Sequence, residues 1–428
     1  MRTVWICESR EKGENNLPGL LYPAYQKFYS AISCLERFRK EQDFFENISC
    51  LDTFFSEYRS ITLVMQKSLA HTPYIDTYTN LVATGCLDPW LNKQRVKSVH
   101  THPVEFIKQV DISIYFPDRG IDLLSESFSV EGDVPISSLN ATLKAVFARI
   151  NPFEVFFSAK CSFPEKDTGE DVLKKALSGL ESMQGFMDRM HSAVGEDCPL
   201  CNQLRDKIAH SNILHIPLDF LTVDDYVYYT TRDEFEHGGR VAGMLGGGMV
   251  PPRSPLKAMD RFHSIREDDY FQKFVVMHIL IGTTDLMPTF MVVYRDGTFQ
   301  LITFHADIKT TFYRKINEVA AIIMSDDVQE VYYMMTYVLC DYTEDNMQLS
   351  SKERMALGKE EFLTFMKVDA DLNEEEYFFD STTLSHHDKL TQHLLSVPSK
   401  KLNLGATNMR PIISAFNAKG STDCTSPV

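Results

Sequence analysis

The sequence lacks two features that would place it in a common class. Its longest apolar runs fall far short of the 18 or so residues that a membrane-spanning helix needs. Positive charge is also short, because 43 lysines and arginines stand against 59 aspartates and glutamates, a formal net charge of −16. Proteins coated with nucleic acid usually carry a net positive field. The composition therefore excludes a membrane protein and argues against a general nucleic-acid coat, while a local basic site remains open.

The N-terminal segment has no apolar stretch of the kind found in secretory signals, and charges occur throughout its first dozen residues. The nine cysteines are an odd number, scattered along the chain and partly set within apolar segments. That pattern is typical of reduced thiols in a reducing compartment. We expect a cytoplasmic protein without disulfides.

Residues 24–69 place apolar side chains at helical spacing and predict two long helices. Asn47 or Ser49 is a candidate cap between them. A third helical stretch covers 91–100. The first part of the chain, residues 1–107, therefore predicts a small helical bundle.

The rest of the chain predicts a multidomain α+β protein. A mixed α/β middle region, 108–237, should contain strands at 111–116, 127–130 and 154–160 and helices at 170–191 and 199–210. A Gly/Pro-rich linker or loop follows at 238–258. A C-terminal α+β domain with a largely antiparallel sheet, 259–380, should contain strands at 274–281, 289–294, 298–304, 330–339 and 376–379 and helices at 313–324 and 351–366.

Residues 381–428 are rich in polar and basic residues and predict a disordered, weakly basic tail.

One short segment reverses the acidic character of the chain. No acidic residue occurs between Asp88 and Glu105. The same interval holds five basic or titratable side chains: Lys93, Arg95, Lys97, His100 and His102. The segment therefore predicts a local phosphate-binding site at a helix end.

Arg95 and His100 are separated by four residues and follow two long helices. This arrangement resembles the HEPN ribonucleases, in which such motifs from two protomers or two domains face each other. The resemblance implies metal-independent cleavage of single-stranded RNA that leaves a cyclic phosphate. Arg95 would hold the scissile phosphate and His100 would move a proton, while Lys93, Lys97 and His102 would bind the substrate.

A second copy of the spacing joins Arg205 to His210. Its Asp206 fits the polar position of the family motif better than Val96 does. Two such units in one chain would supply a composite site, and a plain exposed helix is the alternative.

Cys198 and Cys201 form a Cys-x2-Cys pair that, with His210 and His215, would complete a zinc site. The gap between the pairs is shorter than in the usual zinc finger. We therefore expect reduced thiols and no metal or cofactor.

The resemblance as a whole implies an endoribonuclease of a prokaryotic toxin or antiphage defence system. Its partners would be RNA, a second copy of the chain and an antitoxin or sensor protein, with no membrane. Two alternatives remain open: a non-catalytic binding or scaffold protein that dimerises through the bundle, and a metal-stabilised regulator built around Cys198 and Cys201.

Overall fold

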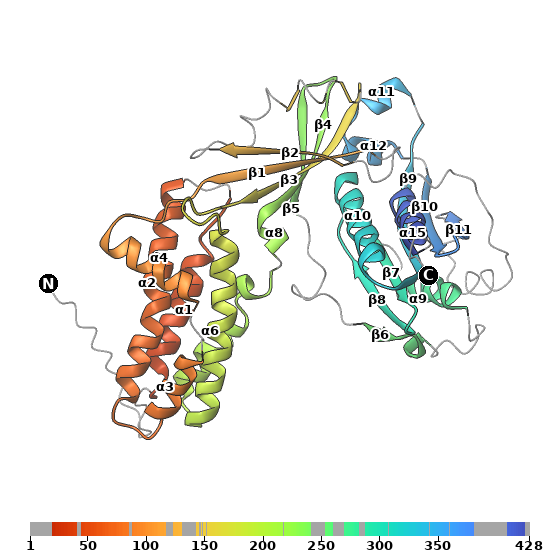
Figure 1. Cartoon of the computed structure of the whole chain (residues 1–428). Coiled ribbons are helices and arrows are strands. Elements are labelled where there is room, and N and C mark those ends of the chain that lie inside the picture. Colours follow the sequence, from red (N-terminus) through yellow and green to blue (C-terminus); the bar gives the residue numbers. More distant parts are fainter. Residues whose placement is uncertain are drawn as a thin grey trace, which may run out of the picture. The chain divides into compact units, whose positions relative to one another are not determined.

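The chain forms two compact units (Figure 1). The helical unit comprises residues 1–106 and 164–214, and the sheet unit comprises 107–163 and 215–428. The computed structural model describes residues 19–40, 44–84, 88–116, 123–130, 143–144, 147, 149–150, 152–216, 218–240, 253–259, 269–281, 287–306, 308–341, 343–358, 360–380 and 409–423. Within these ranges, no helix has both the length and the apolar character required to cross a bilayer.

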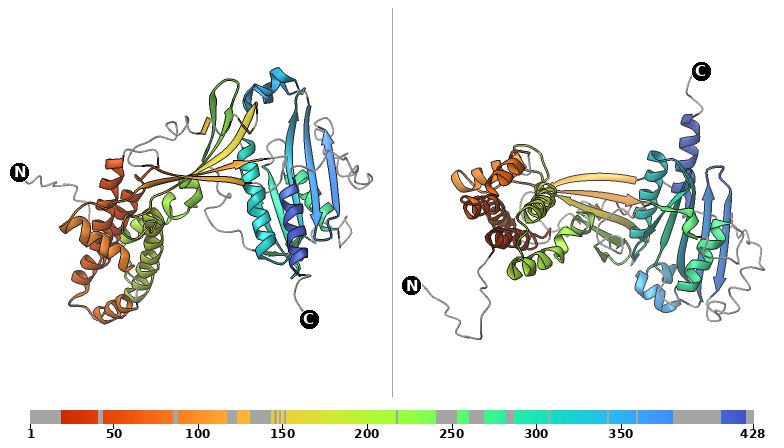
Figure 2. Two further views of the ribbon diagram at one scale, coloured as in Figure 1. Left: turned by 45° about the horizontal axis from the view of Figure 1, so that its top comes forward. Right: turned by 90° about the horizontal axis from the view of Figure 1, so that it is seen from below.

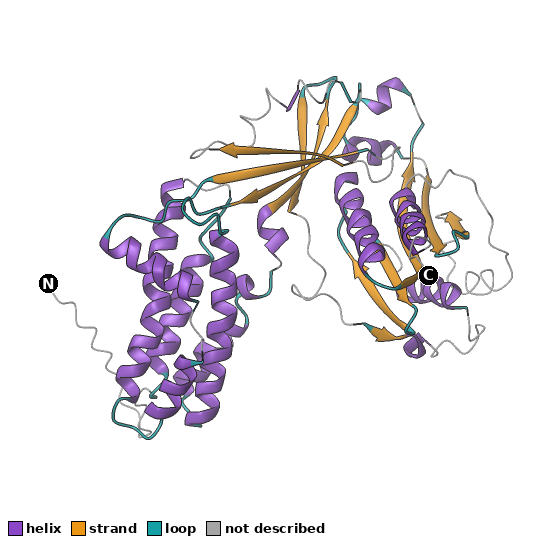
Figure 3. Cartoon of the chain, in the orientation of Figure 1, coloured by secondary structure: helices purple, strands orange, loops and turns teal. Residues whose placement is uncertain are grey.

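The helical unit is built mainly from α-helices, drawn in purple in Figure 3. They are α1 (Tyr22–Leu35), α2 (Phe44–Leu69), α3 (Ile75–Ala83), α4 (Pro89–His100), α6 (Val172–Val194) and α7 (Pro199–Ala209), followed by the short 3-10 turn η2 (Asn212–Leu214). The long helices α1 and α2 pack together, α4 packs on α2, and α7 packs on α1. The mixed α+β class is confirmed.

The first stretch of the helical unit ends at residue 106, close to the predicted boundary at 107. The prediction that 164–214 belong to a separate middle region is wrong, because α6 and α7 belong to the same unit as α1 to α4. Along α6, buried residues recur at helical spacing, including Leu180, Met183 and Met187. A helix with one apolar face must bury that face. Helix α6 buries it against helices that precede strands 108–162 in the sequence. The sequence gives no sign of that return.

Local details of the helical unit also differ from expectation. Helix α2 begins at Phe44, so Asn47 and Ser49 lie inside it rather than at its cap. The Asn47 side chain instead braces the preceding connection, accepting the Arg39 N–H at 3.1 Å and donating to the Arg39 carbonyl at 2.7 Å. Helix α6 continues past His191 and is ended by Gly195, whose φ of 63° favours glycine.

The first sheet of the sheet unit is antiparallel, in the order β2-β1-β3-β4-β5. Its strands are β1 (Lys108–Tyr115), β2 (Leu123–Val130), β3 (Glu154–Ser162), β4 (Val223–Tyr229) and β5 (Glu234–Arg240), with helix α8 (Leu218–Thr222) leading into β4. The strands predicted at 111–116, 127–130 and 154–160 are confirmed. The predicted linker is wrong at both ends, because β5 runs through Gly238 to Arg240, Ser254–Pro255 form a short strand and Leu256–Met259 a 3-10 helix. Residues 241–252 between them lie outside the described structure.

The second sheet is also antiparallel, in the order β11-β10-β9-β7-β8-β6. Its strands are β6 (Ser254–Pro255), β7 (Thr289–Tyr294), β8 (Thr298–Thr303), β9 (Val328–Leu339), β10 (Glu360–Asp369) and β11 (Glu374–Asp380). The helical elements of this part of the sheet unit are η3 (Leu256–Met259), α9 (Tyr270–Ile281), α10 (Lys309–Ser325), α11 (Glu344–Met347), α12 (Ser351–Leu357) and α15 (Arg410–Asp423).

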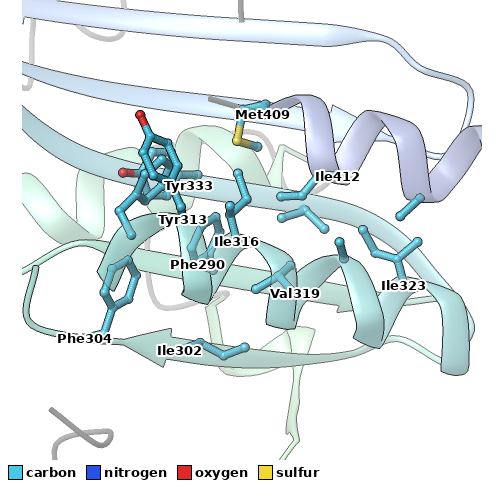
Figure 4. Close-up of a cluster of buried hydrophobic side chains, with 14 of the residues drawn as sticks. Phe290, Ile302, Phe304, Tyr313, Ile316, Val319, Ile323, Tyr333, Met409 and Ile412 are labelled. Carbon is cyan, nitrogen blue, oxygen red and sulfur yellow. The ribbon is translucent and has the colours of Figure 1, made fainter. Parts of the chain in front are cut away.

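The two faces of the second sheet are covered by different helices (Figure 2). On β7, Phe290 and Val292 belong to the core with α10 and α15, whereas Met291 and Val293 belong to the core with α9. This alternation is the period-2 pattern of a strand buried on both faces. Figure 4 shows the α10–α15 side of this core.

Three C-terminal expectations are wrong. Residues 274–281, predicted as a strand, lie in helix α9. The predicted helix 351–366 ends at Leu357, and its second half is strand β10. The predicted tail contains helix α15, whose Ile412 is fully buried, although residues 381–408 lie outside the described structure.

A buried carboxyl in the sheet unit gives a pH prediction. Asp225 on β4 is fully buried and accepts a hydrogen bond from the Thr311 hydroxyl at 2.6 Å. Burial raises its pKa from 3.8 to about 6, against the opposing effects of the Arg314 charge and the Thr311 hydrogen bond. Between these two pKa values the folded state holds a proton that the unfolded state has lost, so this carboxyl makes the free energy of unfolding fall as pH rises.

We expect Asp225→Asn to remove that downward slope between pH 4 and pH 6. Denaturant titrations at several pH values would measure it, with the exposed Asp371→Asn as the matched control. Equal slopes in the wild type and Asp225→Asn would contradict the prediction.

Candidate functional site

The first Arg-x4-His copy lies on α4. This helix begins at Pro89 because the Asp88 carboxylate accepts the Trp90 N–H at 2.8 Å and caps the first turn. Arg95 is half-buried, and His100, the last helical residue, is exposed. Since α4 runs regularly through both positions, five residues place them about 140° apart around the axis. The structure therefore leaves Arg95 and His100 on different faces of α4.

The lysine inside this motif is already paired. Lys97 Nζ donates to Glu165 Oε1 at 2.9 Å and to the Asp167 carboxylate. These hydrogen bonds, that of Asp167 first, raise the pKa of Lys97. The acid-free segment thus meets two carboxylates 68 and 70 residues further along the chain. The structure argues against Lys97 as a substrate-binding residue, because phosphate would have to displace both partners.

The other two predicted substrate-binding residues stay at the surface. Lys93 is exposed. His102 is also exposed, with its Nδ1 2.9 Å from the Pro103 carbonyl oxygen and 3.9 Å from Glu105 Oε1. Carboxylates therefore lie beside two of the predicted substrate-binding residues: Glu165 beside Lys97 and Glu105 beside His102.

The second copy of the motif lines a cleft. A cavity of about 380 Å³ opens between α1, α6 and α7. Its polar lining consists of Tyr25, Gln184, Asp188, Asn202, Arg205 and Asp206. The structure therefore places Arg205 and Asp206, the first two residues of the second motif, in one cleft together with the Asp188 carboxylate.

A histidine on α6 orients the arginine of this cleft. Arg205 Nη1 donates to His191 Nε2 at 2.9 Å. Since an arginine can only donate, Nε2 is the unprotonated nitrogen and His191 is neutral. Burial, together with the positive charge of Arg205, lowers the pKa of His191 and keeps it neutral. The Tyr25 ring packs edge-on against the His191 ring, with 6.1 Å between the two ring centroids. The Tyr25 hydroxyl is buried without a hydrogen-bond partner among the described residues.

His210, the histidine of the second motif, is exposed at the C-terminal cap of α7. Its Nδ1 lies 2.6 Å from the Asp206 carbonyl oxygen. Because a carbonyl only accepts, Nδ1 is the donor in this hydrogen bond. His210 is not among the residues that line the cleft, and five residues along α7 set it about 140° around the helix axis from Arg205.

The two copies of the motif lie at opposite ends of α6. The partners of Lys97 precede Val172, the first residue of α6, whereas His191, the partner of Arg205, lies in its last turn. Nineteen residues at 1.5 Å each separate these ends by roughly 30 Å. Helix α4 meets α6 at Gly179, where an added Cβ would lie 2.1 Å from Leu91 Cδ1. These contacts give no support to a composite site of the two copies within one chain.

The zinc hypothesis concerns the start of the same helix. Cys198 and Cys201 are buried thiols at the first turn of α7. Across the parts of the chain that the structure describes, no three or more His, Cys, Asp or Glu side chains gather in a group able to hold a metal. His210 and His215 do not complete a site with the two cysteines.

Sequence reasoning missed His191 and Tyr25. One signal was present, because His191 continues the series Met183 and Met187 at intervals of four on the buried face of α6. A histidine on an otherwise apolar face needs a polar partner, which the spacing alone does not name.

No protein-family model matches this chain, and neither does any curated protein or solved structure.

Proposed function

We propose that the helical unit is a metal-independent endoribonuclease of the HEPN type. In this proposal Arg205 and His210 are the catalytic residues that cleave single-stranded RNA. The observation that carries the proposal is the α1–α6–α7 cleft, in which the neutral His191 orients Arg205. The α4 copy offers less support because its Lys97 is paired with two carboxylates. The five-residue spacing sets the arginine and the histidine about 140° apart around the helix axis in both copies.

The proposed chemistry needs no cofactor. Arg205 binds the non-bridging oxygens of the scissile phosphate, and His210 Nε2 takes the proton of the attacking 2′-hydroxyl. The 2′-oxygen bonds to phosphorus and the 5′-oxygen leaves, giving a 2′,3′-cyclic phosphate. The leaving oxygen needs a proton, which a second His210 would supply.

That second histidine comes from another copy of the chain in this proposal. The cleft is lined by Arg205 but not by His210, and the carboxylate partners of Lys97 in the α4 copy lie roughly 30 Å from His191 along α6. A two-fold axis beside α7 would bring together two sets of Arg205 and His210. The resemblance also associates such enzymes with toxin and antiphage systems. In this proposal the sheet unit is the part of the chain that contacts an antitoxin or sensor protein.

The test compares the two arginines. Full-length protein is incubated with end-labelled single-stranded RNA in EDTA, and the product ends are identified. We expect cyclic phosphate ends and a rate about 10- to 100-fold lower in Arg205→Ala, the cost of losing a charge-assisted hydrogen bond to phosphate. Arg95→Ala is the matched control and should cleave normally.

Loss of cleavage in Arg95→Ala with normal cleavage in Arg205→Ala would move the site to α4. A wild-type chain that dimerises in sedimentation equilibrium but leaves RNA intact would contradict the enzyme and favour the non-catalytic scaffold.

A further inference from the structure

Two thiols and a carboxylate meet at the first turn of α7. Cys198 is the N-cap residue, and its Sγ accepts the N–H of Cys201 at 3.4 Å and of Gly19 at 3.3 Å. Three residues apart at a helix start, the two thiols need little movement to bond covalently.

Glu196 completes this cluster. Its Oε1 lies 3.8 Å from Cys201 Sγ. The carboxylate also accepts the Leu20 N–H at 2.7 Å and the Leu21 N–H at 2.9 Å, so it is held at the beginning of α1. A fixed carboxylate beside a thiol is placed to accept its proton.

The surroundings make the two cysteines unequal. Burial raises the pKa of both thiols, but the N–H hydrogen bonds outweigh it at Cys198, whose pKa is lowered. The pKa of Cys201 is raised, by burial first and then by Cys198 and Glu196. Cys198 is also the more accessible thiol, at 5% exposure against 0% for Cys201. Cys198 is therefore the thiol that attacks first, and Cys201 is the thiol that attacks second.

We propose that Cys198 and Cys201 are a thiol–disulfide exchange site that takes up two oxidising equivalents from a low-molecular-weight disulfide. The small size of this oxidant follows from the limited exposure of both sulfurs. The site is independent of the proposed RNA cleavage, because it uses neither Arg205 nor His210.

The exchange has two balanced steps. The Cys198 thiolate attacks one sulfur of the oxidant, forming a mixed disulfide and expelling one thiolate, which takes a proton from water. Cys201 then gives its proton to Glu196 and attacks Cys198 Sγ, so the intramolecular disulfide forms and the second thiolate leaves and is protonated. The pair loses two electrons, and the oxidant is reduced to two thiols.

The test equilibrates the full-length protein with reduced and oxidised glutathione under argon, followed by acid quench, alkylation and peptide mass spectrometry. We expect the peptide carrying both cysteines to lose two hydrogens as the buffer becomes more oxidising. Cys201→Ser should stop at a glutathione adduct on Cys198, and Cys198→Ser should leave Cys201 unmodified. Cys34→Ser, which removes another buried thiol, is the control and should oxidise like the wild type.

Glu196→Gln tests the second step separately. Closure of the mixed disulfide should slow by about 100-fold, so the Cys198 adduct should accumulate while its rate of formation is unchanged. Circular dichroism would confirm that the variants remain folded. A pair that stays reduced in fully oxidised glutathione, or a glutathione adduct that forms first on Cys201, would overturn the proposal.

Discussion

His210→Ala is expected to lower the rate of RNA cleavage by about 10²- to 10⁴-fold, the usual contribution of a general acid or base. The side chain is exposed, and its described hydrogen bond joins Nδ1 to the Asp206 carbonyl at the open end of α7. Removing it leaves no buried polar group without a partner, so thermal stability should change little. Activity and folding are therefore separable in this variant.

Single-turnover cleavage of labelled RNA and a thermal melt would measure the two effects together. His100→Ala is the matched control, since it removes a histidine from the other motif at the end of α4. Undiminished cleavage by His210→Ala would remove this residue from the mechanism. A loss confined to His100→Ala would return the site to the first copy.

The sequence predicted the helical unit best where one helix face is apolar. The pattern at Phe28, Ile32 and Leu35 identified α1 because these positions all face the same core. It did not show that α6 and α7 rejoin α1 and α2 after three strands. That return depends on which buried faces match, and a chain carries no local record of a partner more than 100 residues away.

The candidate site shows the same division. Spacing alone identified both copies of the motif and the better fit of Asp206. The choice between them depends on contacts distant in sequence: Lys97 with Glu165, and Arg205 with His191. An acid-free window of sequence cannot reveal a carboxylate supplied by another segment, so the basic patch was overestimated.

Segments with ambiguous periodicity account for the remaining errors. The apolar run 274–281 fits a buried strand or a buried helix, and in α9 it is helical with Phe274 and Val275 facing the sheet. The segment that becomes β10 is composed largely of helix-compatible residues. Pairing with β9 and β11 on either side outweighs that preference.

The tail is the largest departure, and it gives the second prediction. Helix α15 carries many polar residues, yet Met409, Ile412 and Phe416 are buried in the core formed with α10 and the second sheet (Figure 4). Lys419, counted as part of a basic tail, donates to the Ile323 carbonyl at 3.0 Å near the end of α10. Lys419 therefore holds α15 against α10 instead of extending into solvent.

Ile412→Ala is accordingly expected to lower the free energy of unfolding of the sheet unit by about 2–5 kcal/mol, the cost of truncating a fully buried aliphatic side chain. Ile413→Ala is the control, because its side chain is only partly buried, and it should cost clearly less. Trp90 lies in the helical unit, so its fluorescence is a poor probe of this change. Native-state hydrogen exchange of the amides in α10 and α15 reports the sheet unit directly. A docked α15 predicts a loss of protection in both helices for Ile412→Ala, whereas equal and negligible effects of the two substitutions would mean that the tail does not belong to this core.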